Sequence, residues 1–171
     1  MSTIDVAPPR EVQPAYELSG WWRRVGAAAV DAVVVGLGSL VLLVAITAPF
    51  SLGFFASNDA GVTSVAIGLL IAMLCVTVVA LLYAPAMMAR TDGRTLGRMA
   101  TGIRVVRANG EVMTFGFAVI REVVVKVLLF GFAGSATGGI AHLLDVLWPL
   151  WDDENRALHD MVVNTRVVLD A

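Results

Sequence analysis

The feature that most constrains this chain is a pair of long apolar segments that are almost free of charge. Between residues 25 and 58 the only charged side chain is Asp31, and residues 60–89 contain none. A helix needs about 20 apolar residues to cross the hydrocarbon core of a bilayer, and each segment is longer than that. The sequence therefore predicts two transmembrane helices, over about 24–50 and 61–89, with a turn at Asp59.

The overall composition supports the same fold class. Of the 171 residues, 58% are hydrophobic and 15% are charged, whereas soluble domains carry about 25% charged residues. A net charge of −2 argues against nucleic acid as a partner, because nucleic-acid binding needs a basic surface. Cys75 is the single cysteine, so no disulfide forms within the chain, and we expect it to pack as a small hydrophobic residue. We predict an all-α integral membrane protein.

The distribution of basic residues predicts the orientation. All twelve lysines and arginines lie outside residues 25–89. Because cytoplasmic loops carry the excess of Lys and Arg, the N-terminus and the loop 90–116 are expected in the cytoplasm. Residues 1–19, with three prolines and no apolar stretch, predict a disordered cytoplasmic tail rather than a cleaved signal peptide.

The loop 90–116 contains the signals of a small cytoplasmic β-hairpin. The segment Ile103-Arg-Val-Val-Arg107 predicts a short strand, and Asn109-Gly110 is the dipeptide favoured in tight hairpin turns. A return strand is expected towards Met113. Residues 165–169 resemble a second short strand, and pairing between the two strands would require the tail 152–171 to be cytoplasmic as well.

Residues 117–151 form a third membrane segment whose path the sequence leaves open. Its 35 residues are too few for two full spans with a turn, and its glycine-rich centre, 131–139, is where the chain would bend. A single crossing would place the C-terminus outside the cell. A short or re-entrant helical hairpin would return Arg156 and Arg166 to the cytoplasm, and we favour it on loop charge and strand pairing.

Three residues are candidates for binding an ion or proton. Asp31 lies about two turns into the first apolar segment, where a carboxylate must face protein, water or a partner charge. A cation or proton path and a structural polar contact are the two interpretations of Asp31. Glu122 and Lys126 form an i,i+4 pair, either at the membrane interface or with Lys126 as the countercharge of Asp31.

No pattern in the sequence predicts enzymatic chemistry. His142 and Asp145 share a helix face, but two ligands do not make a metal site, and a polar contact is the expected role. The chain has no nucleophile–base arrangement, phosphate loop or zinc spacing. We therefore predict no catalytic residues, no metal and no cofactor.

Several short motifs together resemble the RDD family of membrane proteins. The order is Arg24 and Asp31, then Thr95-Leu-Gly-Arg98, Gly102-Ile-Arg-Val-Val106, Arg121-Glu122 and Leu158-His-Asp160, spread over about residues 20–168. The family is named for one arginine and two aspartates. The resemblance assigns these to Arg24, Asp31 and Asp160, with Arg23 and Asp145 as alternatives. Leu96 stands where the family commonly has proline.

The resemblance implies a bacterial inner-membrane protein, and it raises Asp160 from a loop residue to a candidate. Asp160 could pair with Arg24 or cap a helix, which would hold the tail against the first helix. Transport has been proposed for the family, including cation/proton antiport by some members.

Two functions follow as hypotheses. The first is a transport-related protein that exchanges a monovalent cation for a proton at Asp31, which would need a homo-oligomer to complete a pathway. The second is a non-transporting accessory or scaffold subunit of a larger membrane complex. In both cases the lipid bilayer is the expected surrounding.

Overall fold

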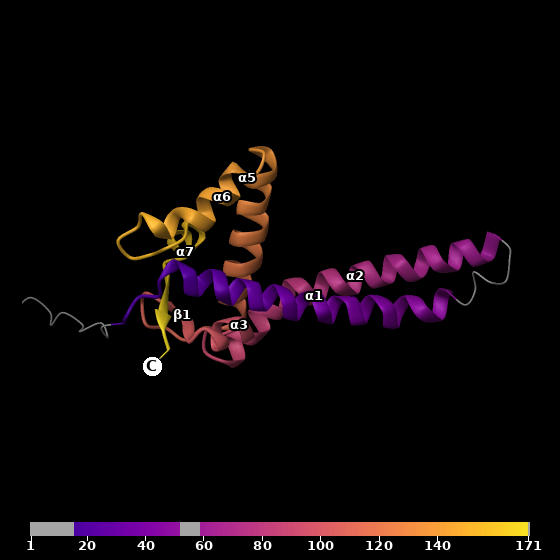
Figure 1. Ribbon diagram of the computed structural model, residues 1–171, viewed down its shortest axis with the longest axis horizontal. Helices are drawn as coiled ribbons and strands as arrows, with labels where there is room; N and C mark the ends of the chain where they lie inside the picture. Colours follow the sequence, from indigo (N-terminus) through magenta and orange to yellow (C-terminus); the bar gives the residue numbers. More distant parts are fainter. Residues whose placement is uncertain (1–15, 52–58, 171) are drawn as a thin grey trace, which may run out of the picture.

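The protein, described here by a computed structural model, consists of a long helical hairpin with a small folded head at one end (Figure 1). The structure describes residues 16–51 and 59–170. The hairpin comprises α1 (Trp21–Ser51) and α2 (Asp59–Arg90), which pack side by side. The turn predicted between them lies largely outside the described residues.

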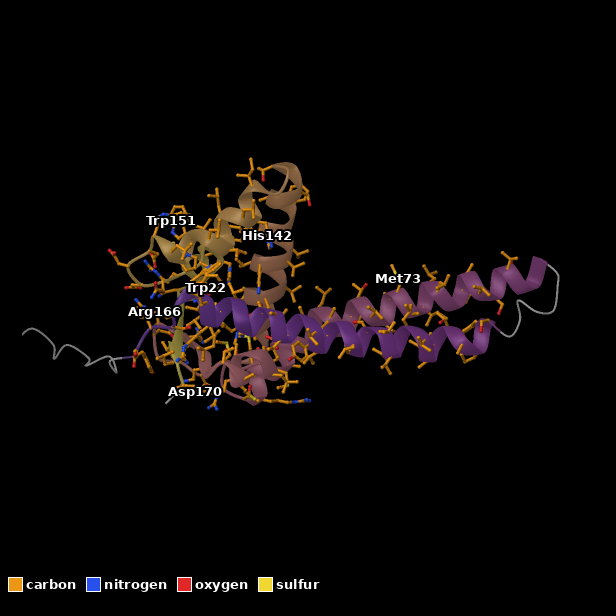
Figure 2. All side chains as sticks on the ribbon, viewed as in Figure 1. Trp22, Met73, His142, Trp151, Arg166 and Asp170 are labelled. Carbon is orange, nitrogen blue, oxygen red and sulfur yellow. The ribbon has the colours of Figure 1, made fainter. Side chains whose placement is uncertain are left out.

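Both long helices are long and apolar enough to cross a membrane, as the sequence predicts. Large apolar side chains such as Val33, Val41 and Leu70 are mostly exposed along them. A helix that is apolar all round requires an apolar surrounding. Figure 2 shows the contrast, since nitrogen and oxygen atoms gather in the head while carbon dominates the far half, where Met73 is labelled.

The 31 residues of α1 exceed what a bilayer requires. At 1.5 Å per residue the helix is about 46 Å long, against about 30 Å of hydrocarbon core. Counting about 20 residues back from Ser51 places the membrane boundary near Ala32. The first three turns of α1, with Arg24 and Asp31, are therefore available to the head.

The head contains a two-stranded antiparallel sheet. Strand β1 (Ile103–Arg107) pairs with β2 (Thr165–Leu169), so that Val105 lies opposite Val167. Both strands have the predicted bounds, but the predicted hairpin with a return strand near Met113 is wrong. Residues 111–114 form no strand, because the strand hydrogen bonds of β1 are made by a segment about 60 positions later in the chain. The pairing brings the tail to the same side as the loop.

Short helices surround this sheet and build the core of the head. They are α3 (Leu96–Ala100), α4 (Phe115–Val119) and α7 (Leu158–Val162). The core side chains come from both long helices, the sheet and α4: Ala27, Met88, Ile103, Val105, Met113, Ala118 and Val167. The head is thus assembled directly on the first turns of α1 and the last turns of α2.

Residues 120–150 fold as a helical hairpin of short helices, and none of them is long enough to cross a membrane. The π-helix η2 (Ile120–Phe130) and α5 (Gly131–Ala136) lead outward, and α6 (Ile140–Leu147) returns to a short 3₁₀ turn, η3 (Trp148–Leu150). The hairpin leaves the α1–α2 pair at a steep angle (Figure 1). The i→i+5 bonding of a π-helix brings residues four and five apart onto one face, and Arg121, Glu122 and Val125 form its buried side.

Gly93 fixes the link between α2 and β1. Its nitrogen donates to the carbonyl of Met88 at 2.8 Å, and its own carbonyl accepts from the nitrogen of Val105 at 3.0 Å. Its φ is +85°, and a Cβ at this position would collide with the Val105 carbonyl oxygen.

We expect Gly93→Ala to lower the free energy of unfolding by roughly 2–4 kcal/mol, from left-handed backbone strain and the collision together. Gly110→Ala is the matched control, because Gly110 has φ +75° and open space around its Cβ position, so only the strain of about 1 kcal/mol applies. Thermal unfolding in detergent, followed by circular dichroism, compares them. Equal losses of unfolding free energy in the two variants would show that the Cβ at position 93 does not collide with the Val105 carbonyl oxygen.

Candidate functional site

Polar and charged side chains gather where the head meets the first turns of α1. They line a cavity of about 650 Å³ between α1, α2, α3, η2 and α6. The three candidate ion-binding residues, Asp31, Glu122 and Lys126, all line it. The structure therefore brings together three residues that lie up to 95 positions apart.

Asp31 joins α1 to α2 and α3. Its carboxylate accepts hydrogen bonds from the Tyr83 hydroxyl at 2.8 Å, the Thr95 hydroxyl at 2.5 Å and the Gly97 nitrogen at 2.8 Å. Thr95 is also the N-cap of α3, since its hydroxyl accepts from the nitrogen of Arg98. Asp31 thus fixes the N-terminus of α3 against the membrane helices.

Gly97 explains why α3 can approach α1 so closely. A Cβ at Gly97 would collide with the Ala27 carbonyl oxygen and lie 2.8 Å from Cγ of Asp31. In the segment Thr95-Leu-Gly-Arg, Thr95 thus donates its hydroxyl to Asp31 and Gly97 donates its backbone nitrogen. The missing side chain of Gly97 is what lets α3 come this close to α1.

Asp160 is fully buried at the start of α7 and is bound by two arginines. Its oxygens accept from Arg24 at 2.7 Å and Arg121 at 2.5 Å. Thr165 donates to it at 3.1 Å, and the nitrogen of Ala157 at 3.3 Å. Both expected roles of Asp160, pairing with Arg24 and capping a helix, are present. Burial alone would raise the pKa of Asp160, but the cations, Arg121 foremost, hold it far below 3.8.

Glu122 is the second buried carboxylate and is surrounded by three cations. Arg98 donates to it at 2.8 Å, Arg121 forms an ion pair with it, and Lys126 lies at 3.4 Å. Burial opposes ionisation, but these three charges keep the pKa of Glu122 well below 4.5. The predicted Glu122–Lys126 pair is present. Among the described residues no ion pair joins Lys126 to Asp31, although both residues line the same cavity.

Asp145 has a partner that the sequence did not indicate. It accepts from the backbone nitrogen of His159 at 2.8 Å, and its carboxylate lies 2.8 Å from Nδ1 of the same residue. Burial would raise the pKa of Asp145, but the hydrogen bond from His159 and its charge lower it. The shared helix face with His142 is not the contact that forms, because Asp145 is buried against α7 while His142 is exposed.

The network holds charge where the head meets the first turns of α1. Arg121 links Asp160 to Glu122, and Arg24 and Arg98 extend the network to α1 and α3. Among residues 16–51 and 59–170, no group of three His, Cys, Asp or Glu side chains could hold a metal ion. The side chains of the network offer ion pairs and hydrogen bonds.

The tyrosine and histidine of this site had only weak signals in the sequence. Tyr83 is a polar residue in a segment without charge, and that isolation is the one available indication. His159 stands beside Asp160 in the Leu-His-Asp motif, but its partner lies 14 residues earlier. Neither contact follows from local spacing.

We expect Asp160→Asn to lower the free energy of unfolding by about 3–5 kcal/mol, because it removes the counter-ion of Arg24 and one of the two counter-ions of buried Arg121. The matched control is Asp92→Asn, since Asp92 pairs with Arg104 at the surface and is 57% exposed. We expect that control to cost less than about 1 kcal/mol. Chemical unfolding in detergent measures both, and comparable losses would exclude a dominant role for the buried pair.

Asp160 and Glu122, two of the buried carboxyls, also predict how stability depends on pH. Their pKa values in the fold lie below the ordinary 3.8 and 4.5, so the unfolded chain binds protons first as the pH falls. Their contribution is complete above about pH 6 and declines below pH 5, by up to about 1.4 kcal/mol per pH unit for each carboxyl. Melting temperatures at pH 7, 5 and 4 test this. A flat profile at 0.5 M salt would contradict it, since buried pairs resist screening.

Comparison with known proteins agrees with the motifs in the sequence. A model of the RDD family matches residues 18–164. "Uncharacterized protein YxaI" of Bacillus subtilis (strain 168) is 28% identical over 156 residues, covering 88% of this chain and 96% of that protein. "Uncharacterized protein YckC" of the same organism is 23% identical over 152 residues, covering 89% and 85%. No solved structure matches the chain. Since the family model covers most of the sequence, this chain belongs to the RDD family of membrane-type proteins.

Proposed function

We propose that the chain is a multi-pass protein of the bacterial plasma membrane, with its N-terminus and head in the cytoplasm. All basic residues lie outside residues 25–89, and those from Arg90 onward belong to the head or its hairpin. The positive-inside rule places such a head in the cytoplasm. The far half of α1 and α2 would then cross the bilayer.

In this arrangement the hairpin of η2, α5 and α6 lies along the membrane surface. It leaves the α1–α2 pair at a steep angle (Figure 1), and Glu122 and Lys126 of η2 line the same cavity as Asp31. The hairpin carries exposed apolar residues, among them Phe132 and Leu143, and exposed Trp151 follows η3. Tryptophan is favoured at membrane interfaces. The third membrane segment is thus a short interfacial hairpin, tied to α1 by a hydrogen bond from Trp21 to the carbonyl of Val146.

The proposed activity is exchange of a monovalent cation for a proton at Asp31. The observation that carries it is that the cavity reaches this carboxylate at the membrane boundary. Two of the three donors to Asp31 are hydroxyls, of Tyr83 and Thr95. A hydroxyl can rotate and present its oxygen. A cation could therefore meet one carboxylate and two hydroxyl oxygens, and a proton would replace it on the carboxylate.

Two helices cannot enclose a pathway, so the proposal includes a homo-oligomer. Gly36 lies four residues after Ala32 on α1, and a Cβ at Gly36 would meet nothing within 4 Å. Small residues four apart allow close helix packing in membranes. A second copy could approach α1 at Gly36.

The test is the loss of a pH gradient in proteoliposomes on adding Na⁺, K⁺ or Li⁺. We expect cation-dependent proton flux in the unaltered protein and at least a tenfold loss in Asp31→Asn. Asp153→Asn is the matched control, because Asp153 is exposed on the loop after η3, and it should retain full flux. No flux in folded, unaltered protein would exclude the exchange activity.

An accessory or scaffold subunit remains the second candidate. The observation that favours it is that each oxygen of Asp31 already accepts at least one hydrogen bond from the protein. On this hypothesis Asp31→Asn lowers the melting temperature and flux is absent throughout. Neither candidate assigns an enzymatic reaction to the chain.

A further inference from the structure

Two arginines that line the cavity carry N–H groups without a partner. Arg24 uses Nη1 for Asp160, and Arg98 uses Nη2 for Glu122. Within the part of the chain that the structure describes, Nε and Nη2 of Arg24 and Nη1 of Arg98 are buried without a hydrogen bond. Buried donors of charged groups are nearly always paired, so an absent acceptor is expected beside them.

The charged groups nearest these two arginines are already engaged with one another. Arg121 pairs with Asp160 and Glu122, and Lys126 pairs with Glu122. Asp145 is held by His159, whose other ring nitrogen lies 3.5 Å from Asp160, and Asp31 accepts from three neutral donors. The remaining N–H groups of Arg24 and Arg98 therefore require an acceptor from outside the described residues, and an anion is the acceptor that suits a guanidinium.

The rest of the cavity wall is apolar and continues along α1 towards the membrane half. Val25, Ala28, Ala32 and Val35 form one side, and Val146 and Pro149 of the hairpin form the other. A small hydrophilic anion would leave this wall uncovered. An amphiphile with an anionic group at one end and an apolar chain at the other would satisfy both regions.

We propose that this cavity binds an anionic phospholipid, with its phosphate at Arg24 and Arg98 and the start of its acyl chains along Ala28, Ala32 and Val35. Guanidinium groups match phosphate through paired N–H donors. A volume of about 650 Å³ is in the range of small-molecule sites and holds a headgroup with its first methylenes. The remaining chain length would extend into the bilayer, beside which the cavity lies.

Lipid binding at Arg24 and Arg98 does not depend on ion exchange at Asp31. Lipid binding at the basic end of the cavity can be measured on protein that shows no flux, and flux can be present when lipid binding fails.

The experiment titrates the full-length protein, in a neutral detergent, with dioctanoyl phosphatidylglycerol and reads bound lipid by native mass spectrometry. The comparison ligands are dioctanoyl phosphatidylcholine and inorganic phosphate. We expect phosphatidylglycerol to bind roughly tenfold more tightly than phosphatidylcholine, and inorganic phosphate not to compete at millimolar concentration.

Two variants separate the phosphate contact from the apolar wall. Arg98→Gln should weaken phosphatidylglycerol binding roughly tenfold, while its matched control, Arg104→Gln, removes an arginine on β1 outside the cavity and should have no effect. Ala32→Phe fills the apolar side without touching an ion pair, so it should weaken lipid binding even if Arg98→Gln impairs folding.

Three results would overturn the proposal. Equal affinity for the two phospholipids would show that the site does not select an anionic headgroup over one whose phosphate charge is balanced by choline. Displacement of lipid by inorganic phosphate alone would identify a free anion as the ligand. Unchanged binding in Ala32→Phe would place the lipid elsewhere on the protein.

Discussion

The head of this protein depends on the buried guanidinium of Arg121. It forms ion pairs with both Asp160 and Glu122. Asp160 forms a second ion pair with Arg24, and Glu122 forms a second one with Arg98. Removing charges from water costs several kcal/mol for each ion, which is recovered only if every charge finds partners. The network therefore requires α1, α3, η2 and α7 to be in place together.

Helix α1 is the element on which the head assembles. Arg24 and Asp31 are seven residues apart, about two turns, and so lie on one face. Arg24 holds α7 through Asp160, and Asp31 holds α3 through Thr95 and its neighbours. The three family-motif residues thus have a common geometric effect: they attach α3 and α7 of the head to the first long helix.

The same arrangement creates a cavity with two kinds of polar wall. Near Asp31 it offers a carboxylate and hydroxyls, while near Arg24 and Arg98 it offers unpaired N–H groups. Both groups of polar atoms lie beside the part of α1 at which the helix leaves the head and becomes apolar all round. A membrane boundary is where an ion, a proton and a lipid headgroup can all reach a protein, and the proposed activities use these different walls.

Features that depend on local pattern could be predicted from the residues alone. The charge-free lengths predict α1 and α2, the β-branched residues predict the bounds of β1 and β2, and i,i+4 spacing predicts the Glu122–Lys126 pair. The pairing of β1 with β2, of Asp145 with His159 and of Asp31 with Tyr83 became visible only in the folded protein. The cause is separation along the chain. These partners are 14 to about 60 residues apart, and periodicity cannot select one distant donor among several until packing brings it within hydrogen-bonding distance.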